Sequence, residues 1–195
     1  MRQEFTQQIE KTAQAVVNDI HTALPGQVVS FNAEKGTATV KPIGKFITSD
    51  NIVLAYPDIA EVPVVFPCSV NAGIAFPVMP GDNCLLIISE VELDEWRNGA
   101  EAEGSLKFDL TNAIAIPGLL NTGNGLISEA ISKNGVVIAS GNNKICVSGS
   151  GISVSGNLSV SGDISCAGEV KSGEIALKTH THLSGEPGEK TSKPQ

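Results

Sequence analysis

Two histidines near the C-terminus have the residue type and the spacing to bind a metal ion. They stand two residues apart in Lys178-Thr179-His180-Thr181-His182. In an extended strand this spacing places both imidazoles on the same side. Such a pair is usually solvated polar sequence, so a metal site requires a structural context that brings in further ligands.

The residues before this pair form a short repeat that supplies such a context. Three hexads run from Ile152 to Glu169 with the pattern apolar, polar, apolar, small, Gly, polar, and a looser unit covers 170–175. Residues two apart point to the same side of a strand, so each hexad offers one narrow apolar face. The apolar pairs are Ile152 and Val154, Leu158 and Val160, and Ile164 and Cys166.

The repeat requires other copies of itself. One copy buries too little apolar surface to offset the conformational entropy that it loses on ordering. The chain could coil on itself as a β-solenoid, or three chains could wrap into a triangular prism. Roughly thirty residues would give a solenoid very few turns, whereas a stable one needs about three repeats and caps. We therefore expect an intertwined homotrimeric β-helix over residues 119–178.

A three-fold axis would gather six imidazoles from His180 and His182 of three chains. Imidazole suits iron, nickel, copper and zinc, and six donors suit an octahedral ion. Zinc in structural sites prefers four ligands, which argues against zinc. The usual affinity order favours nickel or copper over iron, so metal availability would decide between them. Six protein ligands leave no open position, so the site would be structural and not catalytic.

The first part of the chain is predicted to be a helix followed by a small β domain. Over residues 1–23, apolar residues recur at spacings of three and four, which predicts an amphipathic helix that Pro25-Gly26 ends. Over residues 24–118, short apolar segments separated by Pro and Gly turns predict an OB-like β-barrel. The apolar stripe of the helix consists of Phe5, Ile9, Ala13, Val16 and Ile20.

Several elements of the β domain can be predicted individually. Val28–Phe31 and Thr37–Val40 flank a turn with Gly36, which predicts a hairpin. Further strands are expected at Val62–Phe66 and Gly73–Phe76, and a fully buried strand at Cys84–Ile88. Glu92–Trp96 is expected to form a short helical turn, with Trp96 packed in the core or at its rim.

Composition argues against several classes of partner. The net charge is −8, and residues 1–118 hold 15 acidic and 7 basic residues. An acidic surface repels phosphate, so we expect no nucleic-acid partner. The N-terminus lacks the apolar segment of a secretory signal, and prolines interrupt the most apolar stretch, Val62–Met79. Without a CxxC pair, the cysteines are expected to be buried free thiols of a protein made in the cytoplasm: Cys68, Cys84, Cys146 and Cys166.

In their order along the chain, these segments resemble the central spike proteins of contractile phage tails. The resemblance covers about Leu24 to Gln195 and includes a tail, residues 185–195, similar to one that folds back from the tip. It rests on Pro80-Gly81-Asp82, the acidic turn ending at Trp96, Ala113–Gly118, the hexads, and His180-Thr181-His182.

The resemblance implies an OB-like domain, a trimeric β-helix and a pointed apex over residues 179–195. It implies that His180 and His182 are iron ligands, six histidines from three chains holding one ion. Residues 24–118 would sit on the hub of the tail baseplate, and the tip would meet the host outer membrane. The resemblance assigns no role to residues 1–23.

The sequence thus predicts an all-β homotrimer that acts mechanically in the virion after assembly in the host cytoplasm. It would be a membrane-piercing central spike, not an enzyme, and it would take no small-molecule substrate. One alternative is a receptor-binding tail fibre or adhesin tip, but residues 119–195 contain no Phe, Tyr or Trp for recognition. Another is a left-handed β-helix acyltransferase, which needs a longer repeat and a catalytic histidine between its coils.

Overall fold

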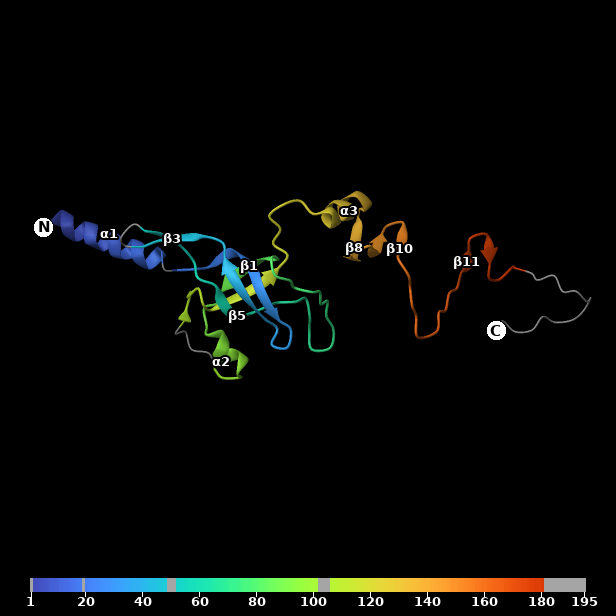
Figure 1. The fold of residues 1–195 in the computed structure, drawn as a ribbon, viewed down its shortest axis with the longest axis horizontal. Coiled ribbons are helices and arrows are strands. Elements are labelled where there is room, and N and C mark those ends of the chain that lie inside the picture. Colours follow the sequence, from blue (N-terminus) through green and yellow to red (C-terminus); the bar gives the residue numbers. More distant parts are fainter. Residues whose placement is uncertain (1, 19, 49–51, 102–105, 181–195) are drawn as a thin grey trace, which may run out of the picture. The chain divides into compact units, whose positions relative to one another are not determined.

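The computed structural model describes residues 2–18, 20–48, 52–101 and 106–180 (Figure 1). The chain divides into two compact units, Met1–Gly125 and Leu126–Gln195. The prediction of a mostly β chain with few helices is confirmed. The first unit contains α1 (Arg2–Asn18), β1 (Ala23–Asn32), β2 (Thr37–Pro42), β3 (Lys45–Ile47), β4 (Val53–Ala55), β5 (Ile59–Pro63), β6 (Asn83–Ile88), α2 (Leu93–Arg97) and β7 (Ala113–Pro117).

The N-terminal helix is shorter than the 23 residues expected from the apolar spacing. It ends at Asn18, and the chain is already extended at Ala23, where β1 begins to pair with β6. Proline disfavours helical backbone at the residue before it, so Leu24 belongs to the strand and not to the helix. Every described side chain of α1 is exposed.

The main sheet of the first unit curls into a half-barrel. Its strand order is β5-β2-β1-β6-β7, and all neighbours run antiparallel (Figure 1). The two edge strands meet at a parallel bridge between Val64 and Ala115, where the Val65 N–H donates to the Ala115 carbonyl at 2.9 Å. The β1–β2 hairpin forms as predicted, and Gly36 has the positive φ of 65° that its turn requires.

The core fills the concave side of this sheet. Val40, Val62, Cys84 and Leu86 are its largest fully buried side chains. The expectation that Cys84–Ile88 is buried on both faces is wrong, because Ile87 is 38% exposed. An antiparallel sheet can leave one face to solvent, so burial alternates along β6.

The segment after β5 departs from the predicted strands. β5 ends at Pro63, and residues 73–76 form no strand, Gly73 making only a bridge to Cys68. Prolines at 63, 67 and 77 lack the N–H that a central strand donates. Phe66 anchors this loop through edge-on ring contacts with Phe31 and Phe76, at centroid distances of 6.4 and 5.3 Å.

Asn112 joins three segments of the first unit through its buried side chain. It is 5% exposed. Its Nδ2 donates to the carbonyls of Val91 at 2.6 Å and Ser89 at 3.3 Å, and its Oδ1 accepts from the Leu93 N–H at 3.0 Å. The side chain therefore connects the end of β6, the start of α2 and the start of β7.

The second unit contains one three-stranded antiparallel sheet with the order β10-β9-β8. Tight turns at Gly141 and at Gly149 join its strands, as the Asn- and Gly-rich sequence leads one to expect. The sequence did not predict the helix that precedes the sheet. The elements are α3 (Gly125–Lys133), β8 (Gly135–Ser140), β9 (Asn143–Ser148), β10 (Gly151–Ser155), β11 (Lys171–Ser172) and β12 (Ile175–Ala176).

The four cysteines are free thiols in two different environments. Cys84 and Cys146 are buried, as predicted, whereas Cys68 and Cys166 are exposed. Cys68 lies in the proline-rich loop, and Cys166 lies in the third hexad, which forms no strand in the single chain.

We expect the stability of the first unit to fall between pH 9 and pH 11. Burial raises the pKa of the Cys84 thiol from 9.0 to about 11. In this interval the unfolded chain loses the thiol proton while the folded chain keeps it, which costs about 2–3 kcal/mol. Urea unfolding across this range should show the loss, and Cys84→Ala should remove this part of the slope. Cys68→Ala, at an exposed thiol, is the control and should leave the slope unchanged.

Candidate functional site

One face of the β8–β10 sheet is apolar and exposed. Ile152 pairs with Val147, which pairs with Val136, so the three form one row across the strands. A second row is formed in the same way two residues further along. We call these six residues the apolar sheet face; they are 42–71% exposed, and they are Val136, Ile138, Ile145, Val147, Ile152 and Val154.

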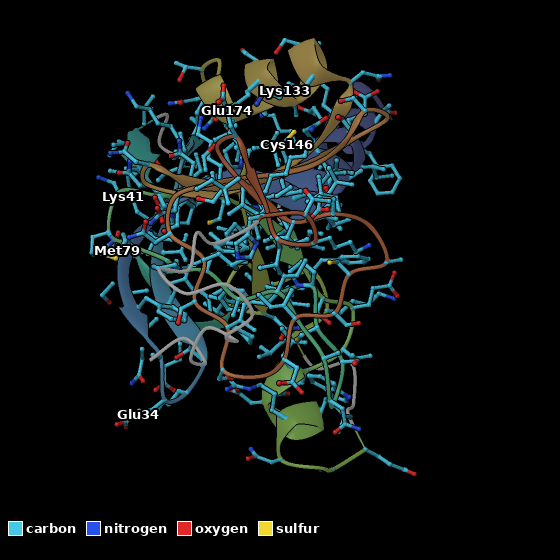
Figure 2. All side chains as sticks on the ribbon, turned by 90° about the vertical axis from the view of Figure 1, so that its right-hand side faces the viewer. Glu34, Lys41, Met79, Lys133, Cys146 and Glu174 are labelled. Atoms are coloured by element: carbon cyan, nitrogen blue, oxygen red, sulfur yellow. The ribbon has the colours of Figure 1, made fainter. Side chains whose placement is uncertain are left out.

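The α3 helix lies on the other face of this sheet (Figures 1 and 2). Lys144 and Cys146 alternate with the apolar residues of β9, and Cys146 is only 5% exposed. Lys144 Nζ lies 2.5 Å from Glu129 Oε2, and Lys133 Nζ lies 3.0 Å from Glu129 Oε1. Hydrogen bonds from Lys144 and then Lys133 hold the pKa of Glu129 below its usual value. The helix therefore covers one face of the sheet and leaves the apolar sheet face exposed.

The hexads continue this exposed apolar surface along the sequence. Only the first hexad is a strand, β10, and residues 156–170 make no strand in the single chain. The first apolar residues of the hexads, Ile152, Leu158 and Ile164, are 69–72% exposed. Val154 and Val160 in the third positions are about 45% exposed. Apolar surface of this extent on a folded chain indicates an interaction site.

His180 follows the β11–β12 hairpin and is exposed. Its N–H donates to the Ala176 carbonyl at 2.9 Å, and its Nδ1 lies 2.9 Å from the Leu177 carbonyl oxygen. When Nδ1 carries the proton of that contact, Nε2 carries the lone pair that a metal ion requires. Metal-binding histidines commonly donate their second ring N–H to a carbonyl in this way. The expected ligand role of His180 stays a prediction.

The second expected ligand, His182, lies outside the described residues, as does the rest of the tail. Within residues 2–18, 20–48, 52–101 and 106–180, no group of three or more His, Cys, Asp or Glu side chains is placed to hold a metal ion. A site built from three chains would not be visible in one. Iron at His180 and His182 therefore stays a prediction.

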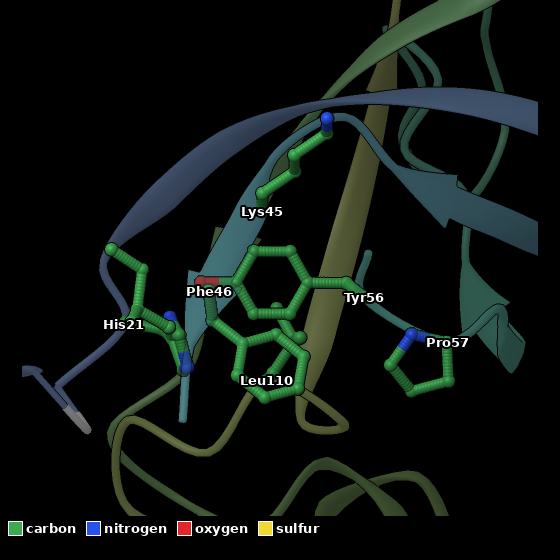
Figure 3. A pocket seen from close by; sticks show the side chains of 7 residues that line it. His21, Lys45, Phe46, Tyr56, Pro57 and Leu110 are labelled. Carbon is green, nitrogen blue, oxygen red and sulfur yellow. The ribbon is translucent and has the colours of Figure 1, made fainter. Parts of the chain in front are cut away.

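An aromatic pocket lies on the first unit, where the sequence did not predict one (Figure 3). The Tyr56 ring stacks on Phe46 at 5.2 Å and meets the His21 ring edge-on at 5.6 Å. The cavity measures about 550 Å³, and Lys45, Ile47, Pro57 and Leu110 complete its lining. Such a mixture of apolar walls and a few polar groups is typical of binding pockets. Because its residues come from distant segments, no local pattern signals it.

Two further expectations can be compared with the structure. Trp96, expected in the core or at its rim, is 66% exposed on α2. Of the helices in the described part of the chain, none combines the length and the apolar character that crossing a membrane requires.

Comparison with known proteins relates the first unit to bacteriophages. Residues 24–118 match the family model of the phage protein Gp138 N-terminal domain. The match covers just under half of the chain and leaves α1 and the repeat outside it. No curated protein matches the chain. The family match supports a structural protein of a phage and a component of the virion.

Proposed function

We propose that three copies of this chain form the central spike of a contractile phage tail or a related injection machine. The spike would breach the host outer membrane mechanically and catalyse no reaction. The phage family match over residues 24–118 supports the phage setting, and the exposed apolar surface of the second unit supports the assembly.

The observation that carries the proposal is the apolar surface of the second unit. The apolar sheet face and the hexads present branched aliphatic side chains at regular intervals, and α3 occupies the opposite side of the sheet. Exposure of this kind costs free energy of about 25 cal/mol for each Å² of apolar area left in water. A prism of three identical chains removes this area from water with one repeated contact.

The proposed prism suits a part that transmits force. Strands of different chains would alternate along its walls, so no chain could leave without breaking hydrogen bonds along its whole length. The surface left outside would be the polar positions of the hexads, mostly Ser, Asn, Asp and Glu. Such a surface offers few apolar or aromatic groups to which a membrane or a receptor could bind.

The proposed apex closes this prism with iron. His180 and His182 of the three chains would supply six nitrogen ligands, and the ion would link the chain ends at the axis. The contact between Nδ1 of His180 and the Leu177 carbonyl, at 2.9 Å, supports metal binding through Nε2. Residues 24–118 would dock on the tail hub at the other end of the spike.

We expect the purified protein to contain about one iron per three chains, since six ligands fill one octahedral site. The measurement is elemental analysis together with the mass by light scattering. His180→Ala/His182→Ala should lose the iron and keep the trimeric mass. His21→Ala, at the remaining histidine of the chain, is the matched control and should keep both. A trimer without metal would refute the iron apex, and a monomer would refute the spike.

A further inference from the structure

The β3 strand, which lines the aromatic pocket, has one unpaired edge. Among the described strands, β3 pairs with β4 alone, in a separate two-stranded sheet. The Thr48 N–H donates to the Ile52 carbonyl at 2.9 Å. Because hydrogen-bonded pairs alternate along antiparallel strands, the backbone groups of Lys45 and Ile47 point away from β4. An edge of this kind is a template for a further strand.

The β3–β4 hairpin is also apolar and exposed. Ile47, Val53 and Leu54 are 68, 55 and 44% exposed, and Lys45 is the one charged residue among the six that pair. The described side chains of α1 are all exposed, so that helix does not cover the hairpin. Proteins usually protect an edge strand with charges, proline or a covering segment. The β3 edge has little such protection, which indicates that a partner covers it.

The pocket beside this edge has walls that suit an apolar or aromatic side chain. The rings of Phe46 and Tyr56 stack at 5.2 Å, and the His21 ring meets Tyr56 edge-on at 5.6 Å (Figure 3). The His21 N–H donates to the Phe108 carbonyl at 3.2 Å, which fixes this wall to the rest of the domain. The volume of about 550 Å³ lies in the range of ligand pockets.

The charges at the pocket favour a ligand with one carboxylate. Within the described residues, Lys45 forms no ion pair, and none of the residues that line the pocket is Asp or Glu. The positive charge that His21 can carry already has the Asp109 carboxylate near it. Residues 1–118 hold 15 acidic and 7 basic residues, an excess that repels a strongly acidic partner. A single carboxylate next to an apolar group fits both observations.

We propose that β3 and the aromatic pocket bind an extended segment of another protein. The segment pairs with the free edge of β3 as a third strand, places an apolar side chain in the pocket and brings a carboxylate to Lys45. In strand addition, main-chain hydrogen bonds give affinity and side-chain pockets give specificity. Residues two apart share one side of a strand, so the apolar and acidic residues are expected at that spacing. The site lies within the first unit and does not depend on the proposed trimer.

Saturation-transfer NMR on the full-length chain tests this site with two synthetic peptides. The first is acetyl-Thr-Phe-Thr-Asp-Thr-amide, whose Phe and Asp share one side when extended. The second has Asn in place of Asp and is the matched uncharged control. We expect the Asp peptide to bind about fivefold more tightly, as for an exposed ion pair. Titration of each peptide measures the difference.

Two pairs of variants locate the binding. Lys45→Glu should remove the preference for the Asp peptide, whereas Lys41→Glu, at an exposed lysine of β2, should keep it. Ile47→Pro removes an N–H that the third strand would use and should abolish binding of both peptides. Proline is tolerated where the N–H of an edge strand faces solvent, so the hairpin should still form. Ile47→Val keeps the N–H and should bind as the native chain does.

Each outcome decides the proposal. A preference for the Asp peptide that Lys45→Glu removes, with binding that Ile47→Pro abolishes, supports strand addition at β3. Equal binding of the two peptides to the native chain overturns it, and so does binding that survives Ile47→Pro. An absence of binding by either peptide also overturns it, and is the result expected if a second copy of the chain covers β3.

Discussion

The Leu158→Asp variant is expected to be monomeric. Leu158 is 69% exposed in the single chain, so the substitution should cost almost nothing if the chain works alone. In the proposed prism, each of three chains would lose about 1.5–3 kcal/mol of apolar burial. Three carboxylates would also be brought into an apolar interior, which is costly without partners. Light scattering should therefore report a threefold lower mass than for the native chain.

The neighbouring residue provides the control for this experiment. Ser159 alternates with Leu158, so Ser159→Asp places the same charge on the other side of the chain. We expect Ser159→Asp to remain trimeric. If both variants keep the trimeric mass, the hexads do not form the core of the assembly. If the native chain itself is monomeric and Leu158→Asp unfolds the second unit, the repeat coils on itself instead.

We expect Asn112→Asp to destabilise the first unit by about 3 kcal/mol or more at neutral pH. The change replaces the Nδ2 donor with an oxygen that faces the carbonyls of Val91 and Ser89. In the native chain, Nδ2 lies 2.6 Å from the Val91 carbonyl oxygen. The hydrogen bonds that Nδ2 donates to the Val91, Ser89 and Leu106 carbonyls would be lost, and a carboxylate would be buried against carbonyl oxygens. Urea unfolding, followed through the fluorescence of Trp96, measures the difference.

The destabilisation by Asn112→Asp should decrease at low pH. Burial and the nearby carbonyls raise the pKa of the introduced carboxyl in the folded state, so its protonated form is favoured there. Stability is then lost as pH rises through the unfolded value of about 4 and is partly regained below it. Asn121→Asp, at an exposed residue, is the matched control and should be nearly neutral. Equal effects at both positions would contradict the bonding role of Asn112.

Elements with strong local signals could be predicted from the sequence. The spacing of Phe5, Ile9 and Val16 located α1, and Gly36 located the turn of the β1–β2 hairpin. The acidic segment before Trp96 located α2. In each case neighbouring residues carry the information, because helix periodicity and turn geometry are local properties.

Features that depend on distant residues could not be predicted. Asn112 is an isolated polar residue before an apolar strand, and only the fold brings Val91 and Leu93 to it. The aromatic pocket unites residues from 21 to 110. The α3 helix could not be predicted because it has only nine residues, and Asn124-Gly125 and Asn134-Gly135 at its two ends are dipeptides typical of turns.

The number of ligands at the histidine pair could not be predicted from one chain. The spacing of the pair and its place after the repeat could be read directly from the sequence. The number of chains that meet there is a property of the assembly. No pattern within one chain fixes this number, so the ligand count depends on the proposed three-fold symmetry.

The hexads are nearly identical, so their strand register is poorly defined. A shift of one strand by six residues against its neighbour still places apolar residues opposite apolar residues. Register in a sheet is usually set by the apolar pattern, which cannot distinguish one hexad from the next. Within the described part of the chain, β10 is the hexad that already pairs with its own chain, Ile152 opposite Val147 and Val154 opposite Ile145. In the proposed trimer, β10 would therefore fix the strand register at the N-terminal end of the repeat. The three chains of that trimer, aligned by their own β9 strands, would close only in phase, from residue 151 towards His180.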